Sequence, residues 1–244
     1  MFKKLFGAFL AFAIIFAISG CGASDDIQED IQSEESENMD VVTGGWELYD
    51  NEANVLPDDV QAAFDKALET FTGSELKPVA YIASQAVAGT NHMILCEAAT
   101  TTEQPEISYQ MVIVYADLEG NAELTQVKEF DLTAYVEGES TDISAEELAG
   151  GWETAEVKSF VSLPQNVKAV FDKAVENLAG NELEPMALLG TQVVAGTNYA
   201  FLCFSTLQTE DPIAGIQVVT VYEDLDGNAE ITNICTLDPA DFNK

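Results

Sequence analysis

The chain contains no arginine and only one histidine, and its basic residues are few. Its 9 lysines stand against 43 acidic residues, which gives a formal net charge of −34 at pH 7. Nucleic-acid binding depends on clustered lysine and arginine that neutralise phosphates. We therefore exclude nucleic acids and anionic lipid head groups as direct partners. A Ser–His or Cys–His mechanism would depend on His92 alone, so the chain is not expected to be an enzyme.

The sequence also lacks an apolar run long enough to cross a bilayer comfortably. Residues 5–18 are apolar and follow two lysines, a pattern typical of a secretory signal. The segment Ile18–Cys21 resembles the lipobox of bacterial lipoproteins. This resemblance implies a lipoprotein signal over residues 1–21, diacylation of the Cys21 thiol, and a chain held by its lipid on the extracytoplasmic side of a cell membrane. A plain secretory signal with a chance cysteine is the alternative.

Residues 22–40 form an acidic stretch. From 24 to 40 the run contains eight aspartates and glutamates and no basic residue. Such a segment repels itself and cannot form a core. We expect a disordered tether between the lipid and the folded part of the chain, with a specific acidic interaction tail as the alternative.

The rest of the chain is an internal repeat. Gln85–Asn91 returns as Gln192–Asn198, and Phe64–Ala67 returns as Phe171–Ala174, both at a spacing of 107 residues. This period is too long for a solenoid unit and has the size of a small domain. The sequence predicts a tandem duplication, with domain 1 over residues 41–132, a linker over 133–149 and domain 2 over 150–244.

Each copy contains one stretch of helical periodicity. In domain 1, apolar residues recur at helical spacing from Val60 to Phe71, with Pro57 suited to the first helical position and Gly73 to the stop. Domain 2 repeats this pattern between Pro164 and Gly180.

The remaining segments of each copy favour strands. In domain 1 they cover 79–84, 92–98, 107–115 and 122–130, and a short edge strand is expected after Gly45. The resulting order is β-α-β-β-β-β, with the last four strands in hairpins. One helix must bury its stripe on one sheet, so each copy is an α+β unit with a four- to five-stranded antiparallel sheet.

Two features of each copy resemble the cystatin family. Gln85–Gly89 and Gln192–Gly196 resemble the QxVxG first hairpin loop of cystatins, and Gly44-Gly45 and Gly150-Gly151 resemble the glycine pair of the cystatin N-terminal trunk. The strand and helix order is also that of the family. The resemblance covers nearly all of both copies and implies two tandem cystatin-like domains.

The resemblance implies a reversible inhibitor of papain-like cysteine proteases that inserts a steric wedge and uses no cofactor and no metal. A small apolar loop can enter a narrow cleft without desolvating charge, and a hairpin lowers the entropy cost of binding. The protease-binding residues that the resemblance implies are Gly44, Gly45, Gln85, Ala86, Val87, Ala88, Gly89, Gly150, Gly151, Gln192, Val193, Val194, Ala195 and Gly196.

The sequence departs from the family at the second hairpin loop. Cystatins commonly carry Pro-Trp there, whereas these loops are Asp117–Asn121 and Asp224–Asn228, each expected to form a type I turn with a glycine bulge. The contact that the second hairpin loop would make with a protease, beside those of the trunk and the first loop, is therefore expected to be weak or differently built. Trp46 and Trp152 follow the glycine pairs and serve either as trunk anchors or as packing residues. A non-inhibitory binding module of the cell envelope on the same scaffold is the alternative function.

The strands imply two further expectations. In the sheet order that the resemblance implies, one strand separates Cys203 from Cys235, a distance beyond disulfide reach. We expect these residues and Cys96 to be buried free thiols. The residues from Tyr199 to Phe204 are apolar on both faces of their strand, so the face away from the helix is expected to pack against the other copy or a partner.

Overall fold

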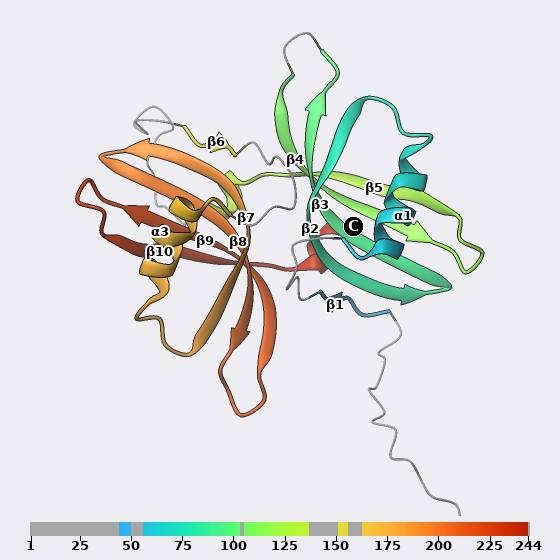
Figure 1. Ribbon diagram of the computed structural model, residues 1–244. Coiled ribbons are helices and arrows are strands. Elements are labelled where there is room, and N and C mark those ends of the chain that lie inside the picture. The colour runs from blue at the N-terminus through green and yellow to red at the C-terminus, as the bar shows by residue number, and fades with distance from the viewer. Residues whose placement is uncertain (1–43, 50–55, 103–104, 137–150, 156–162, 244) are drawn as a thin grey trace, which may run out of the picture. The chain divides into compact units, whose positions relative to one another are not determined.

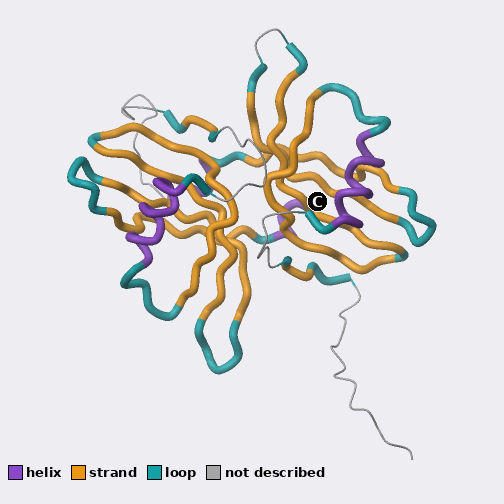
Figure 2. Tube along the Cα trace, viewed as in Figure 1, coloured by secondary structure: helices purple, strands orange, loops and turns teal. Residues whose placement is uncertain are grey.

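Each half of the chain folds as one antiparallel sheet with a helix against it (Figures 1 and 2). The computed structural model describes residues 44–49, 56–102, 105–136, 151–155 and 163–243. The signal 1–21, the tether 22–40 and Gly150 lie outside these residues. The first repeat comprises β1 (Glu47–Leu48), α1 (Asp58–Leu68), β2 (Ser74–Val87), β3 (Gly89–Thr100), β4 (Ile107–Ala116), β5 (Ala122–Phe130) and α2 (Thr133–Val136).

The second repeat has the same order of elements. It comprises β6 (Glu153–Thr154), α3 (Gln165–Val175), β7 (Asn181–Val194), β8 (Gly196–Leu207), β9 (Ile213–Glu223), β10 (Ala229–Leu237) and the 3-10 helix η1 (Pro239–Phe242). Both five-stranded sheets are antiparallel meanders, ordered β1-β2-β3-β4-β5 and β10-β9-β8-β7-β6. The predicted α+β class and β-α-β-β-β-β order are confirmed.

Helix α1 forms where the sequence shows apolar residues at helical spacing. Val60, Phe64 and Ala67 are buried on one face. Pro57 occupies the N-cap position, one residue before the helix, so its predicted place inside the first turn is wrong. The helix ends at Leu68 and does not extend to Phe71, which packs on the same core from outside it.

The predicted helix stops are also displaced. Gly73 has a φ of +130° but follows the C-cap Glu69 by several residues, so it starts the turn into β2 and does not end the helix. In the second repeat, α3 ends at Val175, well before Gly180. Burial of Phe71 kept the apolar pattern regular beyond the last helical turn.

Each sheet is covered on both faces. On one face lies a core shared with the repeat's own helix, which contains Phe64 in the first repeat and Phe171 in the second. On the other face a third cluster, which we call the shared core, contains residues of both repeats. Its largest members include Met93, Leu95, Met111, Phe130, Leu189, Leu202, Ile216 and Leu237.

The shared core confirms the expectation that the second apolar face packs against the other copy. Residues 41–244 accordingly form one compact unit. Part of the predicted linker belongs to this packing, because Val136 of α2 is buried in the shared core and Tyr135 stacks on Phe130. Residues 137–149 of that linker lie outside the described residues. Trp46 and Trp152 also pack on the shared core, which is the packing role that the sequence left open.

The three cysteines beyond Cys21 are free. Cys96 and Cys203 are completely buried beside the helices, and burial raises the pKa of both thiols. Cys235 is only partly buried, so the prediction of three buried thiols is wrong at that position. It lies on edge strand β10, which has a neighbour on one side only.

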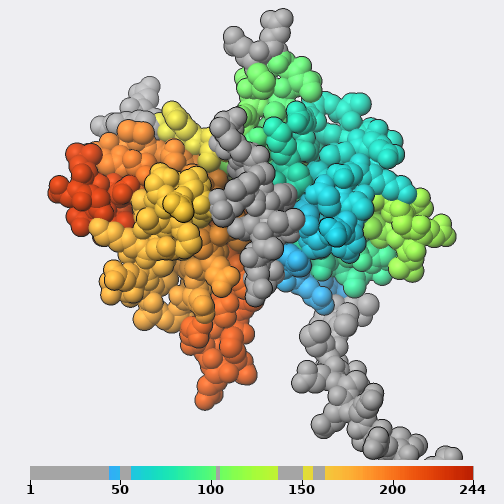
Figure 3. Space-filling model, in the orientation of Figure 1, coloured from blue at the N-terminus to red at the C-terminus, as the bar shows by residue number. Residues whose placement is uncertain are grey.

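The β3–β4 and β8–β9 hairpins extend from the ends of the sheets, and the second projects visibly in Figure 3. Ile107 and Ile213, the first residues of β4 and β9, are exposed there. They lie at the sheet end opposite Gly89 and Gly196, and they provide matched control positions for the substitutions below.

His92 is a titratable imidazole in the first repeat, and the equivalent position of the second repeat is Tyr199. The His92 Nδ1 lies 2.7 Å from the Tyr81 hydroxyl, and burial lowers the pKa of the imidazole against a smaller opposing effect of Asp59. Because the pKa is lower in the folded than in the unfolded state, unfolding takes up a proton. This contribution to stability is complete above the unfolded pKa of about 6.5 and is lost as the pH falls below it.

The equivalent pair in the second repeat is Leu188 and Tyr199. We expect Tyr81→Leu/His92→Tyr, which copies this pair, to lose less unfolding free energy than the wild type between pH 7 and pH 5. Denaturant unfolding at several pH values measures the difference, and carboxylate effects common to both proteins cancel. Parallel pH profiles would contradict the assignment.

Candidate functional site

The first hairpin of each repeat is tighter than the sequence predicted. Strand β2 continues through Val87 and β3 begins at Gly89, so Ala88 alone separates the strands. The predicted loop Gln85–Gly89 is therefore largely paired strand, with Val87 opposite Gly89. Strands β7 and β8 repeat this arrangement around Ala195. A hairpin of this length holds its tip in one conformation.

Gln85 links this hairpin to the segment before the helix. Its side chain is buried, its Nε2 donates to the Gly44 carbonyl oxygen at 2.8 Å, and its Oε1 accepts from Asn91 Nδ2 at 2.8 Å. In the second repeat, Gln192 Oε1 accepts from Asn198 Nδ2 at the same distance. The structure thus brings together the predicted Gln85 and Gly44, and Gln85 spans the hairpin and the trunk.

A tyrosine that the sequence analysis missed supports each hairpin tip. The Tyr115 hydroxyl donates to the Ala88 carbonyl oxygen at 2.7 Å, and the Tyr222 hydroxyl donates to that of Ala195 at 2.8 Å. The only available signal was the return of a tyrosine at the repeat spacing, because the sequence does not show that β4 brings this ring under the tip of β2 and β3. This hydrogen bond from a half-buried tyrosine restrains the tip.

Gly89 and Gly196 are required by the hairpin itself. Gly89 has a φ of +144°, and a Cβ there would lie 2.3 Å from the Ala116 carbonyl oxygen and 2.8 Å from Tyr115 Cε2. Gly196 faces the equivalent clash, 2.3 Å from the Glu223 carbonyl oxygen. Substitution of either glycine would distort the hairpin, so these positions do not separate a binding role from a structural one.

The tips are apolar and open to solvent. Val87 is 46% exposed, Val193 68% and Val194 36%, and Ala86, Ala88 and Ala195 are also exposed. Gly44 and Gly151 are exposed as well, while Gly45 is half-buried. The exposed valines and alanines therefore form an uncovered apolar surface at the end of each sheet.

The second turn of each repeat lies beside the first hairpin. Ala116 of β4 pairs with Thr90 next to the first hairpin, and it also pairs with Ala122 after the second turn. Both turns are therefore at the same end of the sheet. We call the hairpin tip 86–89 and the turn 117–121 tip end one, and their counterparts 193–196 and 224–228 tip end two.

The turn of tip end one is ordered by its own side chains. Asp117 Oδ1 accepts from the backbone N–H of Glu119 at 2.9 Å and of Asn121 at 2.7 Å, and Oδ2 accepts from Asn121 Nδ2 at 2.8 Å. The Asn121 side chain, then its backbone N–H, lowers the pKa of the Asp117 carboxyl. Gly120 has a φ of +83° and its N–H donates to the Asp117 carbonyl oxygen, as in the predicted turn.

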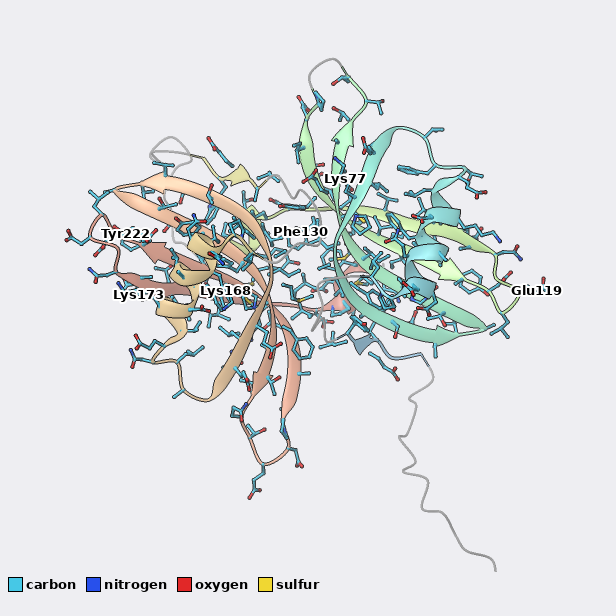
Figure 4. The ribbon with its side chains drawn as sticks, viewed as in Figure 1. Lys77, Glu119, Phe130, Lys168, Lys173 and Tyr222 are labelled. Atoms are coloured by element: carbon cyan, nitrogen blue, oxygen red, sulfur yellow. The ribbon has the colours of Figure 1, made fainter. Side chains whose placement is uncertain are left out.

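The helix also holds this turn. Lys66 Nζ of α1 donates to the Gly120 carbonyl oxygen at 2.6 Å, and Lys173 of α3 donates to that of Gly227. Asp224 accepts the same set of bonds as Asp117, from Asp226 and Asn228. Figure 4 labels Glu119 at the outer end of the β4–β5 hairpin and Lys173 beside the corresponding part of the second repeat.

Each ordered turn presents a leucine. Leu118 is 90% exposed and Leu225 is 86% exposed. From the sequence these turns were expected to be acidic and to lack an apolar anchor, because the flanking carboxylates dominate their composition. The signal that was overlooked is a leucine at the second turn position in both copies. The second turn of each repeat therefore presents an exposed leucine, at the position where cystatins commonly carry an aromatic residue.

The described residues contain no group of three His, Cys, Asp or Glu side chains that could hold a metal ion. Within the same residues, every helix is too short or too polar to span a membrane. No protein-family model matches the chain, and no curated protein shows significant similarity to it.

Proposed function

We propose that this chain has two tandem cystatin-like domains and inhibits papain-like cysteine proteases by inserting tip end one or tip end two into the active-site cleft. The observation that carries the proposal is the convergence of three segments at the tip end of the first sheet, two of which, the hairpin tip and the second turn, recur in the second sheet. In the first repeat these are the Gly44 segment, the exposed Val87–Ala88 tip and the exposed Leu118. Such a surface can fill a cleft, and the inhibitor makes and breaks no covalent bond in doing so.

The energetics of the tips support this function. An apolar tip buries its surface in a cleft without desolvating a charge, at roughly 25 cal/mol for each Å² removed from water. The tip is already fixed by Gln85, Asn91 and Tyr115, so little conformational entropy is lost on binding. Inhibition of this kind requires no catalytic residue in the chain.

The N-terminal residues suggest where the inhibitor acts. Lipidation of Cys21 would hold the chain at the extracytoplasmic side of a cell membrane, and residues 22–40 would separate the folded part from the bilayer. The excess of acidic residues in the folded part would keep it away from anionic lipid, so the lipid anchor would be its one membrane contact.

The proposal is tested by the hydrolysis of a small peptide substrate by papain in the presence of the full chain, purified in a mild detergent. We expect reversible inhibition of papain that competes with the substrate, and no inhibition of the serine protease trypsin. No effect on papain at micromolar chain concentrations would reject the proposal and favour a binding module on the same scaffold.

The exposed leucines provide a specific test of the second turn. We expect Leu118→Ala/Leu225→Ala to weaken papain inhibition by about tenfold, because burial of a leucine side chain contributes about 1.5–3 kcal/mol and alanine retains part of it. The unfolding free energy should not change, since both side chains are exposed in the free chain. An unchanged inhibition constant would show that the second turn does not contact the protease.

A further inference from the structure

The two repeats contact each other through equivalent residues. Gln126 Nε2 of β5 donates to the Phe242 carbonyl oxygen, and Asn233 Nδ2 of β10 donates to the Tyr135 carbonyl oxygen at 2.8 Å. Gln126 and Asn233 stand at the repeat spacing of 107 residues. The first repeat thus binds η1, which follows the last strand of the second repeat, and the second repeat binds α2, which follows the last strand of the first. Such reciprocal contacts are typical of an isologous interface between two subunits.

These contacts determine which ends of the sheets meet. Strand β5 begins at tip end one with Ala122 and ends at Phe130, on the opposite side of its sheet. The Phe130 ring stacks on Tyr135 at 4.9 Å and lies 6.3 Å from the Phe242 ring of the second repeat. Lys128 Nζ donates to the Asp241 carbonyl oxygen and lies over the same Phe242 ring. The far end of β5 therefore meets the short helix that follows β10.

The order of the contacts along the strands gives the relative direction of the sheets. Gln126, in the middle of β5, contacts Phe242 beyond the far end of β10, whereas Tyr135, beyond the far end of β5, contacts Asn233 in the middle of β10. The direction that leads along β5 away from tip end one is therefore the direction that leads along β10 toward tip end two. The tip ends point in opposite directions, as the positions of Glu119 and Tyr222 in Figure 4 also show.

The arrangement is held by buried contacts. Leu95, Leu189 and Leu202 of the shared core are fully buried. The Tyr109 hydroxyl of the first repeat lies 2.9 Å from the Leu189 carbonyl oxygen of the second. A core of this kind does not allow the repeats to rotate until both tips face one target. The apolar tip residues themselves stay exposed and outside this core.

We propose that one chain binds two protease molecules at the same time, one at each tip end, and that it cannot place both tip ends in one protease. This inference rests on the proposed inhibitory function and adds to it the stoichiometry and geometry of the complex. The chain would act as a rigid bivalent connector between two protease molecules. The second tip end would double the number of protease molecules that one chain inhibits, and it would not raise the affinity for a single protease molecule.

The test is a titration of active papain with the full chain in detergent, combined with the mass of the complex by light scattering. Val87→Asp disables tip end one and Val194→Asp disables tip end two. Ile107→Asp and Ile213→Asp place the same charge at exposed positions of the opposite sheet ends.

We expect the wild type and both controls to inhibit two papain molecules per chain and to form a 1:2 complex. Each tip variant should inhibit one papain molecule and form a 1:1 complex. A wild-type 1:1 complex that either tip variant still forms would show that the two sites exclude each other, and the inference would be wrong while inhibition stands. A 1:1 complex lost in only one tip variant would show a single active repeat, with the same consequence. No inhibition by the wild type would reject the proposed function itself.

Discussion

Val87→Asp/Val194→Asp is expected to abolish papain inhibition, with a loss of at least about 100-fold in affinity. Both side chains are exposed in the free chain, so the new carboxylates remain in water and the fold is retained. In the complex the same carboxylates would be buried in an apolar cleft without partners, which costs several kcal/mol each. Inhibition constants against papain measure the effect.

The matched control is Ile107→Asp/Ile213→Asp, with the same change of charge on exposed apolar residues at the opposite ends of the sheets. We expect this protein to inhibit papain like the wild type. An equal loss of inhibition in both double variants would indicate a general effect of charge. Full inhibition by Val87→Asp/Val194→Asp would show that the hairpin tips are not the contact surface.

The second large effect is expected in the shared core. Leu95→Ala and Leu202→Ala each remove a fully buried leucine at equivalent positions of the two repeats. Each substitution is expected to lower the free energy of unfolding by about 2–5 kcal/mol, from lost burial and the cavity that remains. Because both leucines lie in one core, both repeats should unfold together in a single transition at lower denaturant concentration.

Denaturant unfolding followed by tyrosine and tryptophan fluorescence and by circular dichroism checks this result. The control is Leu118→Ala, which removes the same side chain from a 90% exposed position and should leave the transition unchanged. Two separate transitions, of which Leu95→Ala moves only one, would show that the repeats are independent domains and that the shared core contributes little.

The sequence predicted the longer strands and the helices α1 and α3 because their patterns are local, whereas the short helices α2 and η1 were not predicted. The stripe of Val60, Phe64 and Ala67 follows helical spacing, and the four longer strands of each copy follow turn glycines and apolar runs. The helix end was misplaced because Phe71 is partly buried against the same core without being helical. Periodicity reports burial, and it cannot show which backbone conformation produced that burial.

The candidate site was only partly predictable for a related reason. The tip residues Val87 and Val194 and the neighbouring Gln85 followed from the motif, and the structure places these residues at one end of each sheet. Tyr115 and Lys66 act on the tips from strands or helices distant in the chain, so no local pattern indicates them. The apolar second face of the sheet required a partner, but only the packed structure identified that partner as the other repeat.

The central claim, that the tips occupy a protease's active-site cleft without reacting there, is tested most directly by a protection measurement. Papain is mixed with the full chain and treated with a reagent that labels the active-site thiol. The mass of each protein is then measured by mass spectrometry. We expect the papain cysteine to stay unlabelled and the chain to be recovered intact. Labelling at the rate of free papain, or cleavage of the chain at Ala88 or Ala195, would contradict it.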